Sequence, residues 1–196
     1  MGIVPLGSGN VLAKELGIPV ELSAAFDLLT GTHRIRVLDA LRVGEDYFLL
    51  AVSAGISAFT MAETAREQKR RLGQLAYLLN GARIILSKSL WPFRVSIDGR
   101  PFSVRASEVI ATNVGVIGYK PIRWGTHVLP DDGKVDLCHV RVESILSLFS
   151  LVGGLLFERQ DRLEELTCHS ATGFIEIRSR RRIPVQGDGE HIQGSG

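Results

Sequence analysis

The stretch FRVSIDGRPFSVRA constrains the fold more than any other part of the chain. Its centre, Asp98-Gly99, is a dipeptide typical of a tight turn between two β-strands. Val95 and Ile97 alternate with polar residues before the turn, and Phe102 and Val104 do so after it. Alternate residues of a strand share a face, so these four side chains are expected to enter one core. The stretch therefore predicts an antiparallel hairpin with one buried face.

The same alternation recurs along the chain and predicts further strands. They are expected at Ile35–Val37 and Phe48–Val52, with a turn at 44–46 between them, and in EVIATNV, KVDLCHVRV and GFIEIRS. Helical spacing is found at Val11–Leu16, Glu21–Leu29, 62 to about 86, and 143–158. Strands and helices do not alternate in this order, which argues against a Rossmann-type sheet. We predict an α+β fold that is mainly an antiparallel β-sandwich with two or three helices.

The composition excludes several classes of protein. Of 196 residues, 45% are apolar and 22% are charged, which is typical of a globular chain. Lys and Arg number 23 against 21 Asp and Glu, so the overall positive charge of a nucleic-acid-binding protein is missing. The longest apolar run, Ile145–Phe157, is interrupted by serines and is shorter than the about 20 residues that span a bilayer. No secretion signal is found, so a cytoplasmic location is expected.

The two cysteines each precede a histidine, a pattern that suggests a zinc site at first sight. Cys138 and His139 lie in a predicted strand, where neighbouring side chains point to opposite faces and cannot share one metal ion. We therefore expect Cys138 and Cys168 to be ordinary packed thiols in a reducing compartment.

The motif PLGSGN places two glycines and a serine directly before the first predicted helix. Free backbone N–H groups at a helix N-terminus favour a phosphate, Gly7 and Gly9 allow a close approach, and Ser8 can donate a hydroxyl hydrogen bond. Asn10 is the expected N-cap of the helix. The motif lacks the lysine of a P-loop and the third glycine of a dinucleotide fingerprint. It predicts either a phosphate site or a common glycine turn.

Two further Asp-Gly turns carry carboxylates. VLPDDGKVD is either a plain hairpin turn or a site where Asp132 and backbone carbonyls bind Mg²⁺. QGDGEH sets Asp188 and Glu190 two residues apart, where they either accept a proton or hold a metal, or simply form a turn. The preceding RSRRR is either a solvated strand face or a contact for phosphate or an anionic membrane.

Taken in order, several segments resemble the latter part of the diacylglycerol kinase catalytic family, which includes bacterial lipid kinases and the sphingosine and ceramide kinases. The segments are GIVPLGSGNVLAKELGIP, RVGEDYFLLAVSAGISA, KRRLGQLAYLL, SEVIATNV, LPDDGKVDL and IPVQGDGE. In that family a nucleotide-binding domain with a Gly-Gly-Asp-Gly-Thr loop precedes a Gly-Thr-Gly-Asn segment and a β-sandwich domain. No Gly-Gly-Asp-Gly-Thr occurs here. The resemblance implies a remnant of the nucleotide-binding domain at 1–30, a lipid-kinase β-sandwich at 31–196, and a missing N-terminal nucleotide-binding domain as partner.

The resemblance also implies roles for individual residues. Ser8 stands where the family's threonine contacts ATP, in a loop shaped by Gly7, Gly9 and Asn10. Asp132 would be the carboxylate ligand of a structural Mg²⁺, with the carbonyls of Leu129 and Lys134 as co-ligands. Asp188 and Glu190 match the family's Asp-Gly-Glu, one residue of which is the proton acceptor. The family's glycine cluster after the ATN strand appears here as VGVIGYKP, which is a departure in the wall of the acceptor pocket.

The implied reaction is transfer of the γ-phosphate of ATP to a lipid hydroxyl, such as that of diacylglycerol, at a membrane surface. Such a reaction needs positioning and charge neutralisation, which a phosphate loop, Mg²⁺ and a carboxylate supply. Two alternatives stay open: a non-catalytic β-sandwich module that binds lipid or a partner, and a relative of the kinases of soluble metabolites or NAD. The acceptor lipid and the oligomeric state, including a homo-oligomer, also stay open.

Overall fold

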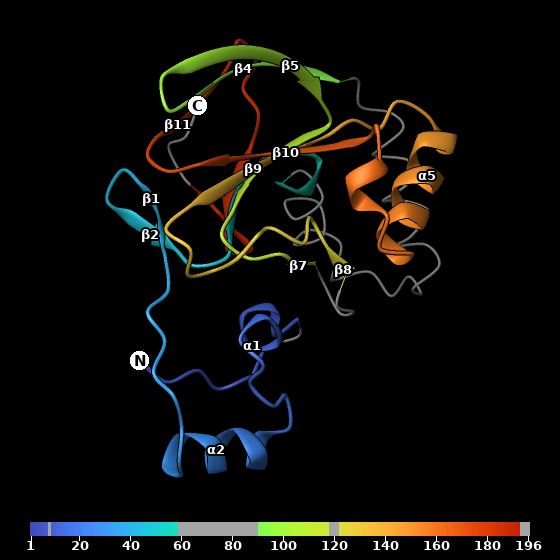
Figure 1. The fold of residues 1–196 in the computed structure, drawn as a ribbon. Helices are drawn as coiled ribbons and strands as arrows, with labels where there is room; N and C mark the ends of the chain where they lie inside the picture. Colours follow the sequence, from blue (N-terminus) through green and yellow to red (C-terminus); the bar gives the residue numbers. More distant parts are fainter. Residues whose placement is uncertain (8, 59–89, 118–121, 193–196) are drawn as a thin grey trace, which may run out of the picture.

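The computed structural model describes residues 1–7, 9–58, 90–117 and 122–192 (Figure 1). Its helices are α1 (Val11–Glu15), α2 (Leu22–Thr30), α5 (Ile145–Leu156) and the 3-10 helix η1 (Gln160–Arg162). Its strands are β1 (Leu41–Val43), β2 (Asp46–Phe48), β3 (Ala51–Gly55), β4 (Trp91–Ile97), β5 (Arg100–Ala106), β6 (Glu108–Thr112), β7 (Val116–Ile117), β8 (Ile122–Arg123), β9 (Val135–Val140), β10 (Leu166–Ala171), β11 (Ile175–Ser179), β12 (Val185–Gly187) and β13 (Glu190–His191). The helix predicted at 62 to about 86 lies outside the described residues.

Two sheets face each other and form the sandwich. The larger sheet has the strand order β10-β9-β6-β3-β12-β13, and the smaller has the order β11-β4-β5. All the described strand pairs are antiparallel. Phe93 and Val95 from β4 meet Val109 and Leu137 from the larger sheet in a buried apolar core. The predicted α+β class with an antiparallel β-sandwich is confirmed.

The other face of the larger sheet is covered in part by α5 (Figure 1). Leu151 of this helix packs with Val140 and Leu166 of the sheet in a second apolar cluster. Ser144 begins the helix, because its hydroxyl accepts the Ser147 N–H while the Ser147 hydroxyl accepts the Ser144 N–H. The helix predicted over 143–158 is therefore confirmed.

The hairpin predicted from Asp98-Gly99 is also confirmed. Asp98 and Gly99 have φ values of 49° and 81°, as a two-residue turn of this type requires. The Asp98 carboxylate accepts hydrogen bonds from the backbone N–H groups of Thr172, Gly173 and Phe174. This contact links the β4–β5 turn to the loop before β11, and so holds together two parts of the smaller sheet that are far apart in sequence.

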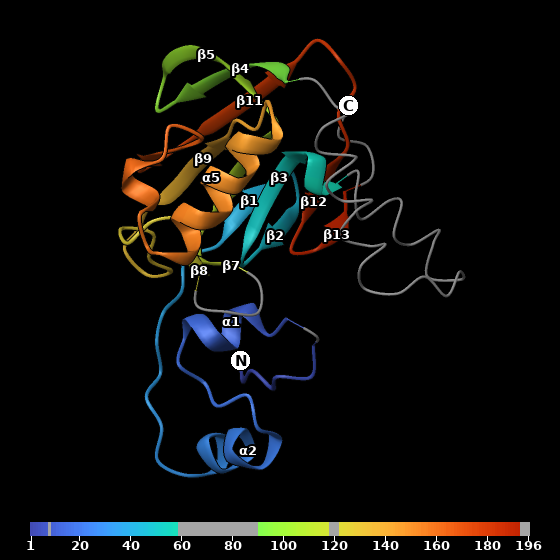
Figure 2. The ribbon, with the colours of Figure 1, turned by 90° about the vertical axis from the view of Figure 1, so that its right-hand side faces the viewer.

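The N-terminal segment lies at one end of the molecule, away from the smaller sheet (Figures 1 and 2). Glu15 of α1 links it to the sandwich, because its carboxylate accepts the Val116 N–H at 2.9 Å and contacts the Arg123 guanidinium at 2.9 Å. The strand predicted at Ile35–Val37 is wrong: these two side chains are 89% and 85% exposed, and the segment pairs with no described strand. The domain boundary after residue 30 stays a prediction.

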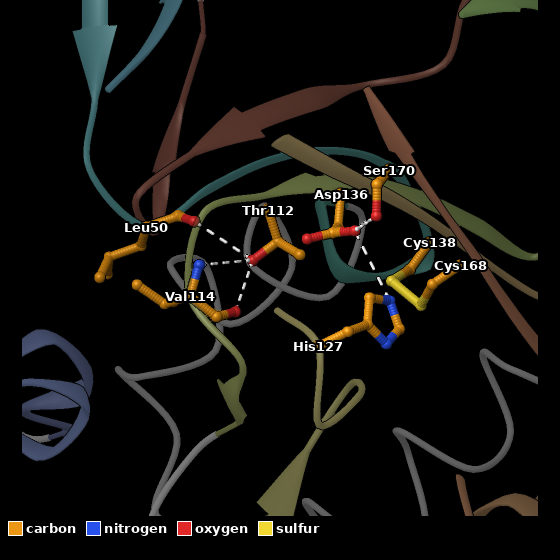
Figure 3. Close-up of a disulfide and its surroundings, with 8 residues drawn as sticks. All are labelled: Leu50, Thr112, Val114, His127, Asp136, Cys138, Cys168 and Ser170. Carbon is orange, nitrogen blue, oxygen red and sulfur yellow. Dashed lines mark hydrogen bonds and ion pairs between the residues drawn. A yellow bond between two sulfur atoms is a disulfide. The ribbon is translucent and has the colours of Figure 1, made fainter. Parts of the chain in front are cut away.

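The prediction of free thiols is also wrong. Cys138 and Cys168 stand directly opposite each other on β9 and β10 and form a disulfide (Figure 3). The two cysteines are 30 residues apart in sequence, so their pairing follows only from the register of β9 against β10. His139 does point to the other face of β9, where its ring stacks on that of His169 at 5.8 Å. No metal-binding group of three or more His, Cys, Asp or Glu residues is found in the described part of the chain.

Candidate active site

The motif QGDGEH forms the hairpin that joins β12 to β13. Asp188 and Gly189 occupy the turn with φ values of 50° and 91°, and Gly187 pairs with Glu190. Gly187 is required here, because a Cβ atom at this position would lie 2.2 Å from the Phe48 ring. The ring of Phe48 therefore packs directly on the backbone of the hairpin and fixes its position.

The Asp188 carboxylate binds the backbone of the segment that leads into β3. Its oxygens accept hydrogen bonds from the N–H groups of Leu49, Leu50 and Ala51 at 2.8, 2.9 and 3.0 Å. The Asp188 N–H donates in return to the Ala51 carbonyl at 2.9 Å. Four hydrogen bonds thus connect one turn residue to three consecutive backbone positions 137 to 139 residues away in sequence. This arrangement assigns Asp188 a structural role, whatever else it does.

Glu190 has the opposite environment. It begins the two-residue strand β13 with an exposed side chain. Within the described part of the chain, its carboxylate has no hydrogen bond or ion pair, whereas the Asp188 carboxylate has three hydrogen bonds. The structure therefore brings the two carboxylates onto one hairpin, with that of Asp188 hydrogen-bonded to the backbone and that of Glu190 exposed.

A buried polar network lies next to the hairpin, and the sequence analysis missed it. Gln186 of β12 donates through Nε2 to the hydroxyls of Ser53 and Ser57 at 3.0 and 2.7 Å. Glu108 accepts the Ser57 N–H at 2.9 Å and also the Ser57 hydroxyl proton. Burial raises the pKa of the Glu108 carboxyl, although the hydrogen bonds from the serines act in the opposite direction. The spacing of Ser53 and Ser57 gave no signal, because strand β3 ends between them.

This network fixes β12 from the side opposite to the sandwich core. Val185 packs in the core, so the next residue, Gln186, points to the other face of the sheet. The Gln186 Oε1 atom is buried and has no hydrogen-bond partner in the described part of the chain. A buried acceptor of this kind is normally satisfied by a hydrogen-bond donor.

The predicted phosphate loop is only partly described. Gly7, Gly9 and Asn10 precede α1, whereas Ser8 lies outside the described residues. Asn10 occupies the N-cap position, but its backbone is left-handed with φ of 48° and its side chain makes no capping hydrogen bond. The predicted N-cap position of Asn10 is therefore confirmed, but its side chain does not supply the capping hydrogen bond. The role of these four residues in binding ATP stays a prediction.

The turn predicted to bind Mg²⁺ is held by several contacts around Asp132. Its carboxylate accepts the Lys134 N–H at 3.1 Å and lies 3.7 Å from the Lys134 ammonium. Asp39 accepts the Gly133 N–H at 2.7 Å and so supports the same turn from the linker before β1. Leu129, Asp132 and Lys134 lie within six residues and offer one carboxylate and two carbonyls, a donor set that suits a hard cation. Metal binding by this turn stays a prediction.

A second polar cluster lies beside the disulfide and is linked to the same strand as that turn. Asp136 is buried on β9, where it accepts the Ser170 hydroxyl proton at 2.5 Å and lies 3.5 Å from His127 Nε2 (Figure 3). Thr112 on the neighbouring strand bonds the backbone of Val114 and Leu50. These contacts fix β6 and β9 to their loops, and so hold the end of the sheet from which the Asp132 turn and Leu50 extend.

Comparison with known proteins agrees with the fold. The family described as "YegS C-terminal NAD kinase beta sandwich-like domain" matches residues 50–195. A protein of Pseudomonas aeruginosa named "Probable lipid kinase YegS-like" is 29% identical over 196 residues, which cover 99% of this chain and 62% of that protein. One of Escherichia fergusonii named "Probable lipid kinase YegS" is 26% identical over 198 residues, which cover 99% and 63%.

Solved structures share the fold. A crystal structure of a provisionally assigned diacylglycerol kinase from Bacillus anthracis str. Sterne superposes with a TM-score of 0.76 at 26% identity, covering 97% of this chain and 62% of that one. The chain thus spans less than two thirds of the length of these relatives. In the described part of the chain, no helix is long and apolar enough to cross a membrane. Because the matched family covers most of the sequence and all of the sandwich that carries the Asp188–Glu190 hairpin, the chain belongs to the family of YegS C-terminal, NAD kinase-like β-sandwich domains.

Proposed function

We propose that this chain is the β-sandwich part of an ATP-dependent lipid kinase that transfers the γ-phosphate of ATP to a lipid hydroxyl, such as that of diacylglycerol. The observation that carries the proposal is the β12–β13 hairpin, in a chain whose relatives are named lipid kinases. It presents one exposed carboxylate, Glu190, on a turn that Asp188 fixes to β3. The acceptor would be a lipid at a membrane surface.

In this proposal the two carboxylates have different roles. Glu190 accepts the proton of the attacking hydroxyl, since its oxygens are not engaged by described residues. A carboxylate is a weak base for an alcohol, but it suffices when the proton leaves late and the hydroxyl is well oriented. Asp188 is a positioning residue that fixes the hairpin through the N–H groups of Leu49, Leu50 and Ala51.

The remaining parts of the reaction fall to other segments. The loop of Gly7, Ser8, Gly9 and Asn10 would bind phosphates of ATP, together with a nucleotide-binding domain that the 62% coverage of the relatives leaves room for. Leu129, Asp132 and Lys134 would hold a structural Mg²⁺, which supplies positive charge and rigidity to the turn before β9. We expect no turnover from the 196-residue chain alone.

The test is steady-state kinetics on the full-length protein with labelled ATP and mixed lipid acceptors. Glu190→Gln should lower kcat by about 10²-fold or more, the usual scale for a positioned acid–base group, with little change in KM for ATP. Glu164→Gln, an exposed glutamate outside the hairpin, is the matched control and should leave both unchanged. A near-wild-type kcat for Glu190→Gln would leave the sandwich as a lipid- or partner-binding module.

A further inference from the structure

A cleft of about 920 Å³ opens between the two sheets and is bordered by the β1–β2 hairpin. Its floor is formed by Val52, Ala54 and Ala111 of the larger sheet, and Ile175 and Ile177 of β11 form the opposite wall. Neither Asp188 nor Glu190 is among the described residues that line it. The cleft is therefore separate from the Asp188–Glu190 hairpin, although Lys134 of the predicted Mg²⁺ turn lies at its edge.

The cleft exists because the larger sheet presents small side chains at this position. Stacked sheets lie about 10 Å apart, and their inner side chains normally interdigitate and leave no space larger than a water molecule. Here Ala54 and Ala111 face β11, which is an edge strand of the smaller sheet. As a result Ile175, Ile177 and Val185 are only partly buried, although they pack against the core. Apolar surface of this extent is stabilised when an apolar group covers it.

The charged residues along the cleft are mostly cations. The lining includes Arg42, Lys134, Arg178 and Arg181 against the carboxylates of Asp39 and Glu176. Arg178 is paired with Glu176, and Lys134 is paired with Asp132. Arg42 and Arg181 have no carboxylate partner in the described part of the chain. An anionic group bound in the cleft would supply the negatively charged partner that these two guanidinium groups lack among the described residues.

The chemistry of the lining selects one kind of ligand. Single-stranded nucleic acid is bound by exposed aromatic platforms, but Phe93 in the lining is 1% exposed and only Phe174, at 69%, is accessible. A small polar metabolite would leave the alanine, valine and isoleucine surface uncovered. An alkyl chain with an anionic head satisfies both parts, and the volume lies in the usual range for ligand sites.

We propose that this cleft binds an anionic amphiphile, with the hydrocarbon chain between β11 and the floor of the larger sheet and the carboxylate or phosphate head at Arg181. The site goes beyond the proposed kinase reaction, since it needs neither ATP nor Glu190. It makes the sandwich itself a receptor for a fatty acid or an anionic phospholipid.

The test is calorimetric titration of the full-length protein, without ATP or metal, with oleate and with oleyl alcohol below their aggregation concentrations. Oleate should bind to the wild type, and Ala111→Phe, which fills the floor, should weaken both ligands at least tenfold. Arg181→Gln should weaken oleate about tenfold and leave oleyl alcohol unchanged. Arg182→Gln is the matched control, because this exposed neighbour does not line the cleft, and it should bind both ligands as the wild type does.

Several results would overturn the proposal. Absence of oleate binding to the wild type would do so, as would equal effects of the Arg181 and Arg182 variants or loss of oleate binding in Glu190→Gln. Arg181 lies on an exposed loop, so its variant tests the head-group contact even if Ala111→Phe does not fold. If the protein binds oleate but phosphorylates no lipid, the proposed kinase function is contradicted and the proposal for the cleft is supported.

Discussion

Replacing Asp188 with Asn should destabilise the fold, whereas replacing Glu190 with Gln should not. Asp188 Oδ1 accepts the N–H groups of Leu50 and Ala51, and Oδ2 accepts that of Leu49. An asparagine can turn its single oxygen to the first two donors, but its NH₂ group then meets the Leu49 N–H. One hydrogen bond is lost, and the other two lose their charged acceptor.

The size of the effect follows from these contacts. A hydrogen bond to a charged group contributes about 1.5–3 kcal/mol when shielded, and less at an exposed turn such as this one. We expect Asp188→Asn to lower the free energy of unfolding by about 1–2 kcal/mol. For a chain of this length each kcal/mol corresponds to about 2–4 °C in Tm. Glu190 makes no described side-chain contact, so Glu190→Gln should stay within about 0.5 kcal/mol of the wild type.

Denaturant unfolding of both variants measures the stability, and kinetics on the full-length protein measure the turnover. The expected pattern is an Asp188→Asn protein with lower stability and a Glu190→Gln protein with normal stability and low kcat. Lower stability in Glu190→Gln together with an unchanged Asp188→Asn would refute the assignment of roles.

Two further predictions concern the pH and the metal dependence of stability. The pKa of Glu108 is raised in the folded state by burial, so its contribution is fully present below the unfolded value of 4.5 and is lost as the pH rises through the folded pKa. Glu108→Gln should therefore flatten the pH dependence of the unfolding free energy above about pH 4.5. Urea unfolding at a series of pH values measures this, and the same dependence on pH in the variant and the wild type would count against it. If Asp132 holds Mg²⁺, the wild type should gain thermal stability with Mg²⁺ and Asp132→Ala should not, since a ligand of the native state stabilises by RT ln(1 + [L]/Kd). Identical wild-type melting curves with and without Mg²⁺ would leave the turn as a plain hairpin.

The elements with strong local signals could be predicted from the sequence. Asp98 and Gly99 are residue types that readily adopt a left-handed backbone, and the alternation on both sides of them specifies which face is buried. The helical spacing at 143–158 likewise predicted α5. In each case the information lies within about a dozen residues, so a local pattern is sufficient.

The failures share a different cause, which is dependence on distant partners. Ile35 and Val37 alternate as a strand would, but alternation cannot supply a neighbouring strand, and none of the described strands pairs with them. The disulfide depends on the register of β9 against β10, which brings Cys138 opposite Cys168. A pattern read along one segment contains no information about either.

The candidate site depends both on a local sequence pattern and on contacts with distant residues. That QGDGEH is a turn follows from its own residues, and the structure confirms it. Which carboxylate is available does not follow, because Asp188 and Glu190 look equivalent until Leu49, Leu50 and Ala51 point their N–H groups at the first of them. In an extended segment both side chains would share a face, but the left-handed backbone at Asp188 turns its carboxylate towards β3. The backbone conformation of the turn thus separates a carboxylate that is held by backbone N–H groups from one that is exposed.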